Sequence, residues 1–155
     1  MKSSFILSTE PKASAALSGM MGERGITVTG DFSVASVDGA RKVLKAYDIG
    51  LGFAPVGHKQ FEGDGKTPEG QYFISHKNPD SQYHLSLGIS YPNEADIAFA
   101  EAEGKSPGGD IFIHGGPNTR VSKRDWTWGC IALTDKEIER VYSMVKPGTP
   151  VFILP

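Results

Sequence analysis

The chain has 155 residues, of which 39% are hydrophobic and 22% are charged, and its formal net charge is −2. These values are typical of one ordinary soluble domain. The 18 acidic and 16 basic side chains nearly balance, which argues against nucleic acid or an anionic membrane surface as a partner. The longest apolar stretches, such as residues 151–154, are far shorter than the roughly 20 residues that span a bilayer. We therefore expect no transmembrane segment.

The N-terminal segment, residues 1–30, is predicted to be a loosely attached extension, with one helical turn at most, ahead of a domain over residues 31–155. Residues 1–24 are rich in Ser, Ala, Gly and Met and show weak periodicity. They resemble a secretory signal only faintly, because polar residues 8–12 interrupt an apolar core that would need roughly 7 to 15 residues. We expect either that a signal was removed beforehand or that the chain is made without one.

The rest of the chain is predicted to be mainly β. Its 19 glycines and 10 prolines divide it into short segments and indicate many turns and few long helices. The strand candidates are rich in β-branched or aromatic residues and are bounded by turn-forming residues. They are residues 25–29, 43–51, 70–75, 83–89, 110–114 and 149–154.

Two short helices are predicted. The first, near residues 94–103, is rich in Ala and Glu, follows Asn93 as a cap and stops at Gly104. The second, near residues 135–146, begins with a Thr134-x-x-Glu137 capping box and carries an apolar stripe with helical spacing. Pro147 and Gly148 end this second helix.

No cofactor or metal site is predicted. Residues 65–67 mimic the end of a phosphate-binding loop, but Gln60 stands where that loop needs its first glycine and Pro68 stands where its helix should begin. The four histidines share no metal-ligand spacing, and scattered structural histidines are the simpler interpretation. We expect neither a metal nor an organic cofactor.

Residues 110–133 differ in kind from the rest of the chain. A short apolar strand leads to His114, and the single cysteine, Cys130, follows across a polar loop. A thiol becomes a useful nucleophile when a nearby imidazole can take its proton. The two side chains can meet if their flanking segments are neighbours. Spacing alone leaves a second interpretation open, in which Cys130 is a small buried hydrophobe and His114 a structural histidine bonded to backbone.

Several motifs in this chain resemble one protein family. They are His114-Gly115 followed by Thr127-Trp128-Gly129-Cys130, the upstream segments 57–59 (GHK) and 62–70 (EGDGKTPEG), and residues 83–93 and 107–110. In order and type they resemble the catalytic domain of the L,D-transpeptidases, the YkuD or ErfK/YbiS type. The resemblance covers about residues 40–155 and implies a mainly β fold with mixed sheets in a sandwich-like arrangement.

The resemblance also implies catalytic roles. Cys130 would attack the carbonyl between diaminopimelate and the terminal D-alanine of a peptidoglycan tetrapeptide stem. His114 would take the thiol proton and return it to the leaving amine, with the Gly115 carbonyl orienting the ring. The backbone amides of Trp128, Gly129 and Cys130 would hold the oxyanion. An amine of a second stem would resolve the thioester into a 3→3 cross-link, or water would hydrolyse it.

Two residues depart from the family pattern: Trp128, with which the chemistry should survive, and Ala132, which affects the grip on the substrate. Trp128 stands where a histidine often precedes Gly-Cys, and Ala132 stands where many members carry Arg or Asn. A basic loop residue, with Arg120 as the first candidate, would take over the lost contact to substrate, or would simply be a solvated charge. The other candidates for substrate binding, each with a structural alternative as a packing or satisfied residue, are Thr127, Trp126, Tyr83 and His84.

The leading hypothesis is a cysteine L,D-transpeptidase that acts on donor and acceptor peptidoglycan stems in the periplasm or the extracytoplasmic cell wall. Such an enzyme would serve cell-wall biogenesis or degradation and cell shape. One alternative is an L,D-carboxypeptidase or another stem hydrolase, including a wall-targeting effector. The alternative from another class is a non-catalytic module that binds the cell wall.

Overall fold

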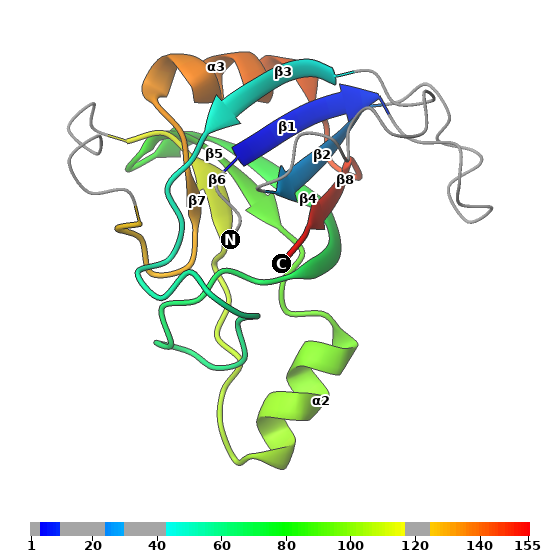
Figure 1. Cartoon of the computed structure of the whole chain (residues 1–155), viewed down its shortest axis with the longest axis vertical. Helices are drawn as coiled ribbons and strands as arrows, with labels where there is room; N and C mark the ends of the chain where they lie inside the picture. Colours follow the sequence, from blue (N-terminus) through cyan, green and yellow to red (C-terminus); the bar gives the residue numbers. More distant parts are fainter. Residues whose placement is uncertain (1–3, 10–23, 30–42, 117–124) are drawn as a thin grey trace.

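The computed structural model describes residues 4–9, 24–29, 43–116 and 125–155 (Figure 1). In these residues eight strands form one sheet in the order β3-β1-β2-β8-β4-β5-β6-β7. The strands are β1 (Ser4–Thr9), β2 (Arg24–Thr29), β3 (Val43–Asp48), β4 (Gly70–Ser81), β5 (His84–Ile89), β6 (Phe112–His114), β7 (Ile131–Ala132) and β8 (Pro150–Ile153). The helices are α2 (Glu94–Ala102) and α3 (Asp135–Met144).

Strand β4 joins the two halves of the sheet. Its first residues, Gly70 to Phe73, pair with β8, and the remainder pairs with β5 through a register that shifts twice. Irregularities of this kind bend a strand and increase its twist. The sheet is mixed, because β2–β8 and β6–β7 are parallel and the other neighbours are antiparallel. The result is the curled sheet in Figure 1.

The hydrophobic core lies between the sheet and α3. Alternate residues on β8, Val151 and Ile153, are fully or almost fully buried, as expected for a strand with one face inward. Helix α3 packs against β5 and β6 through Ile138 and Val141, which are also fully buried. The apolar stripe predicted for this helix therefore faces the core.

Helix α2 lies in the connection between β5 and β6 and extends away from the sheet (Figure 1). Asn93 caps it by accepting a hydrogen bond from the Asp96 amide, and the Asp96 side chain accepts one from the Asn93 amide. Of its residues only Ala100 is buried. No helix in the described ranges is long and apolar enough to cross a bilayer.

The predicted mainly β fold with two short helices is confirmed. Both helices occur where the sequence places them, and the capping box of Thr134 and Glu137 is present. The strands end within a few residues of expectation, except that β4 continues to Ser81 because pairing with β5 extends it. Strand β7 was not predicted, since two residues carry no periodic pattern.

The expectation of a loose N-terminal extension is wrong for two of its segments. β1 lies between β2 and β3, and β2 pairs with β8. Local periodicity in a six-residue segment is weak, so hydrogen bonding to strands that are distant in sequence decides its conformation. The helical turn that we expected within residues 1–24 is not formed at residues 4–9, which are strand, and residues 10–23 lie outside the described part of the chain.

Candidate active site

Parallel pairing of β6 and β7 brings His114 and Cys130 to the same place. Ile113 pairs with Ile131 and His114 with Ala132, so Cys130, the residue before β7, lies beside Phe112. The Phe112 amide donates a hydrogen bond to Cys130 Sγ at 3.5 Å. His114 and Cys130 line one cavity of about 490 Å³, which we call the histidine cavity. The two segments are therefore neighbours, as the motif required.

The His114 ring is buried, with 3% of the residue exposed. Its Nδ1 is hydrogen-bonded to the Gly115 carbonyl oxygen. A carbonyl can only accept, so Nδ1 carries the proton, and in the neutral ring Nε2 keeps a lone pair. Tyr83 stacks on the ring at 4.3 Å between centroids, and the Trp126 ring meets it at 5.9 Å and a steep angle. These contacts fix both the orientation and the tautomer of a potential base.

The surroundings of the Cys130 thiol disfavour its charged form. Burial has the largest effect and raises the Cys130 pKa; the Phe112 amide, next in size, lowers it, and the smaller effects of the Asp110 carboxylate and the Lys59 ammonium raise and lower it, respectively. The sulfur also lies 3.6 Å from the Asp110 carbonyl oxygen, to which the S–H donates. A thiol in this state needs a base to take its proton before it can attack a carbonyl.

Residues 127–130 form the turn that presents the thiol. The buried Thr127 hydroxyl donates to the Cys130 carbonyl oxygen at 2.7 Å and accepts from the Gly129 amide at 3.2 Å. Gly129 has φ +135°, and a Cβ there would lie 2.7 Å from the Lys66 carbonyl oxygen. Only glycine fits this position without displacing backbone. Thr127 is thus engaged inside the protein, and its predicted contact with substrate stays a prediction.

Cys130 also lines a second cavity, of about 320 Å³. We call it the loop cavity, because the loop of residues 57–69 forms one wall of it. Cys130 and Asp110 line both cavities. Asp110 is exposed and has φ +54°, a conformation that Asp tolerates better than most residues. Cys130 therefore borders two cavities.

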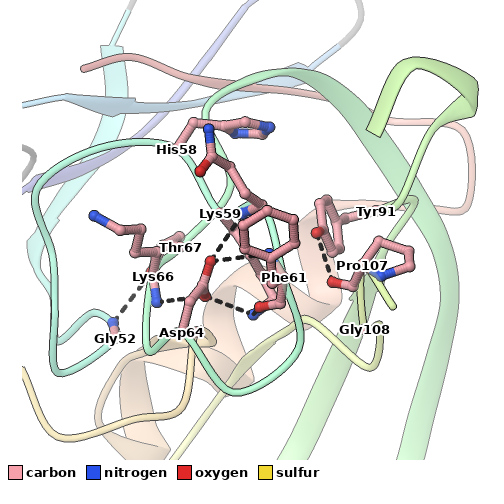
Figure 2. A network of polar contacts seen from close by, with 12 residues as sticks. Gly52, His58, Lys59, Phe61, Asp64, Lys66, Thr67, Tyr91, Pro107 and Gly108 are labelled. Carbon is pink, nitrogen blue, oxygen red and sulfur yellow. Dashed lines mark hydrogen bonds and ion pairs between the residues drawn. The ribbon is translucent and has the colours of Figure 1, made fainter. Parts of the chain in front are cut away.

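Asp64 holds the loop of residues 57–69 in shape (Figure 2). Its carboxylate accepts from the amides of Gln60, Phe61 and Lys66 at 2.8–3.0 Å and from Lys59 Nζ at 2.9 Å. Burial alone would raise the Asp64 pKa, but these hydrogen bonds outweigh burial and lower it. The ion pair neutralises Lys59, which is 3% exposed and lines the loop cavity.

The remaining predicted substrate residues occupy different places. Tyr83 lines the histidine cavity and is 41% exposed. Trp128, whose amide was predicted for the oxyanion site, is 71% exposed, lines the loop cavity and packs edge-on against Phe53. His84 is not among the cavity-lining residues, and its Nε2 pairs with Glu139 on α3 at 2.7 Å. Arg120 lies outside the described residues.

Sequence reasoning missed three residues that shape the site: Lys59, Asp64 and Asp135. Lys59 and Asp64 lie in the motif segments 57–59 and 62–70, but the resemblance assigned no role to either residue. Asp135 begins α3 and accepts a hydrogen bond from the Gly116 amide at 2.9 Å. No feature of the sequence indicates that Asp135 lies close to Gly116. Within the described ranges, no three His, Cys, Asp or Glu side chains are grouped to hold a metal ion.

The fold and this site define a class, a curled β-sheet protein with a cysteine and an oriented histidine in one cavity. Residues 26–153 match the family model of the YkuD L,D-transpeptidase catalytic domain. The chain belongs to that family. The match begins at Ile26 on β2, so it includes a strand from the segment that was expected to be an extension.

The relatives agree with this assignment. The "Putative L,D-transpeptidase YafK" of Escherichia coli strain K12 is 34% identical over 113 residues, which are 72% of this chain and 40% of YafK. The crystal structure of the helical cell shape determining protein Pgp2 from Campylobacter jejuni is 32% identical with a TM-score of 0.57, over 73% of this chain and 39% of Pgp2. The chain therefore spans less than half the length of these relatives.

A more distant structure supports the fold alone. The L,D-transpeptidase from Mycobacterium smegmatis is 16% identical with a TM-score of 0.50, over 85% of this chain and 54% of that protein. At this identity the likeness concerns the fold and assigns no role to any residue.

Proposed function

We propose that this chain is a cysteine L,D-transpeptidase that forms 3→3 cross-links between peptidoglycan stems. One observation carries the proposal: Cys130 and a histidine with a fixed tautomer line the same cavity. Membership of the L,D-transpeptidase family supports the same reaction class.

The first step would convert a stem into an acyl-enzyme. His114 Nε2 takes the proton from Cys130 Sγ as the sulfur attacks the carbonyl that joins diaminopimelate to the terminal D-alanine. The C–N bond then breaks, the proton passes from His114 to the leaving amine, and the stem remains as a thioester. The raised pKa of Cys130 favours this coupling to His114, because burial disfavours the free thiolate.

Backbone amides in the turn before β7 would stabilise the tetrahedral intermediate. We predicted the amides of Trp128, Gly129 and Cys130 for this role. The Gly129 amide already donates to Thr127, so we assign the main contribution to Cys130 and Trp128. Gly129 would still allow the substrate carbonyl to approach the backbone closely.

The second step would use the second of the two cavities that Cys130 borders. With the donor stem in one cavity, the amine of a second stem enters from the other and attacks the thioester carbonyl. The new C–N bond forms as the C–S bond breaks, and His114 passes the proton of the amine to Cys130 Sγ. The histidine cavity offers Tyr83 as a wall, and the loop cavity offers Trp128. Aromatic side chains provide rigid apolar surface for such contacts. Water in place of the amine would make the enzyme an L,D-carboxypeptidase.

Peptidoglycan stems lie outside the cytoplasmic membrane, so we place the activity in the periplasm or the cell wall. A role in cell shape is consistent with the name of the relative Pgp2. Both assignments follow from the proposed substrate.

The proposal is tested by incubating purified disaccharide-tetrapeptide with the wild type and with Cys130→Ala, and analysing the products by mass spectrometry. Cross-linked dimers that require Cys130 are the expected result. Tripeptide without dimers would replace transpeptidation by hydrolysis. Unchanged substrate with a well-folded wild type would contradict the proposal on this stem and favour a module that binds the wall.

A further inference from the structure

The His114 base depends on a single peptide unit, the one that joins Gly115 to Gly116. Its carbonyl oxygen accepts from His114 Nδ1, and its N–H donates to Asp135 Oδ1 at 2.9 Å. In a trans peptide the C=O and N–H lie in one plane and point in opposite directions. An acceptor that holds the N–H on one side therefore aims the carbonyl to the other side.

A peptide between two glycines is easily rotated, because glycine accepts both signs of φ at little cost. Rotation of this unit would turn the carbonyl away from His114 and leave the ring without its acceptor. The flanking backbone is already held, since Leu133 donates to the His114 carbonyl at 2.8 Å and Gly115 donates to the Leu85 carbonyl at 3.3 Å. These bonds leave the orientation of the 115–116 peptide to be set by Asp135.

Space around Gly115 points to the same restraint. A Cβ at this position would lie 2.7 Å from Asp135 Oδ1 and 2.8 Å from the Tyr83 carbonyl oxygen. The carboxylate is therefore packed against the glycine, with no room for a side chain between them. Asp135 is also the first residue of α3, a helix fixed to the core by Ile138 and Val141. The Asp135 carboxylate, which accepts the hydrogen bond, is therefore held on a rigid helix.

We infer that Asp135 is a positioning residue for catalysis: by holding the Gly116 amide it aims the Gly115 carbonyl at His114 and keeps the imidazole in the Nδ1–H tautomer. The inference rests on the proposed role of His114 as the base. It adds a requirement that the His114–Cys130 pair alone does not contain, a carboxylate that acts on the histidine through the peptide between Gly115 and Gly116.

The direct test is the tautomer of His114, measured by ¹⁵N NMR on the full chain labelled in its histidines, at a pH where the ring is neutral. The signal is assigned with His114→Gln. The wild type should show the Nδ1–H form. Asp135→Ala should add the Nε2–H form, and Asp135→Asn, which keeps an oxygen acceptor, should restore the wild-type spectrum.

Turnover of disaccharide-tetrapeptide provides the second readout. Asp135→Ala should lower kcat by about tenfold to a hundredfold, the range for one hydrogen bond to a charged group, with KM nearly unchanged. Asp135→Asn should recover most of that loss. Thr134→Ala is the matched control, because it removes the cap of the same helix but leaves the bond between Gly116 and Asp135 in place.

The outcomes separate the two proposals. The positioning role would be overturned if Asp135→Ala kept the wild-type tautomer. It would also be overturned if Thr134→Ala changed the tautomer and kcat as much as Asp135→Ala does. Full turnover in His114→Gln would overturn the proposed base itself, whatever the tautomer of the Asp135 variants.

Discussion

The two flanks of the Cys130 thiol are built by different means. On the side of the histidine cavity, the pairing of β6 with β7 and the first residue of α3 position the His114 imidazole, which is packed among aromatic side chains. On the loop side, a segment without regular structure surrounds a single carboxylate, Asp64, that satisfies three amides and one buried lysine. One wall of the site therefore depends on the sheet, whereas the other depends on one side chain.

The largest effect is expected on the histidine flank. His114→Ala removes the proposed base and should reduce turnover on the order of 10²- to 10⁴-fold, the usual contribution of general acid–base catalysis. Circular dichroism should show an unchanged fold. His76→Ala is the control, since His76 is exposed and is not a lining residue of either cavity at the thiol. Activity close to wild type in His114→Ala would remove this flank from the chemistry.

On the side of the loop cavity, Asp64→Ala should destabilise the protein most. The change leaves the buried Lys59 ammonium without its partner, and we expect a loss of about 3–5 kcal/mol in the free energy of unfolding. Asp64→Asn, which keeps one oxygen, should lose less. Urea denaturation measures both. Equal stability of Asp64→Ala and wild type would show that the loop holds its shape without the carboxylate.

The same carboxylate predicts a pH dependence. The folded-state pKa of Asp64 is lowered, so its stabilisation is fully present above the ordinary Asp pKa of about 3.9 and is lost as the pH falls through the lower folded-state value. Urea midpoints measured from pH 6 downward should therefore fall more steeply for the wild type than for Asp64→Asn. Parallel curves would contradict this.

Thr127→Val tests the turn between the two flanks. It removes a buried hydroxyl that bonds to both Gly129 and Cys130, and the unfolding free energy should fall by about 1–3 kcal/mol. Thr127→Ser keeps the hydroxyl and should stay close to the wild type. A Thr127→Val protein with wild-type stability but weaker substrate binding would instead support the predicted contact between Thr127 and the stem.

The smallest effect concerns Asp110, which belongs to both flanks. Because its carboxylate raises the Cys130 pKa, Asp110→Asn should speed alkylation by iodoacetamide at pH 8. The gain should be less than about tenfold, since an exposed charge acts through a high dielectric. Asp80→Asn, in the same histidine cavity, is the control. A slower reaction in Asp110→Asn would reverse the assigned sign.

The sequence was sufficient for the parts of the molecule that local chemistry determines. A cap, an Ala- and Glu-rich composition and a terminal glycine located α2, a capping box with helical spacing located α3, and the motif around His114 and Cys130 led to the family. The sequence was insufficient where a partner distant in the chain decides the outcome. β1 is a strand because β2 and β3 flank it, and Asp135 reaches Gly116 only because α3 packs beside β6.

The placement of β8 has a consequence for how the protein is made. Ile26 and Val28 on β2 pair with Val151 and Ile153 on β8, and β8 also pairs with β4. Forming contacts between such distant positions costs loop-closure entropy and slows folding. During synthesis the sheet therefore stays open until residues near position 150 have left the ribosome. Until then β2 and β4 expose unpaired edges, and the nascent chain needs protection from aggregation.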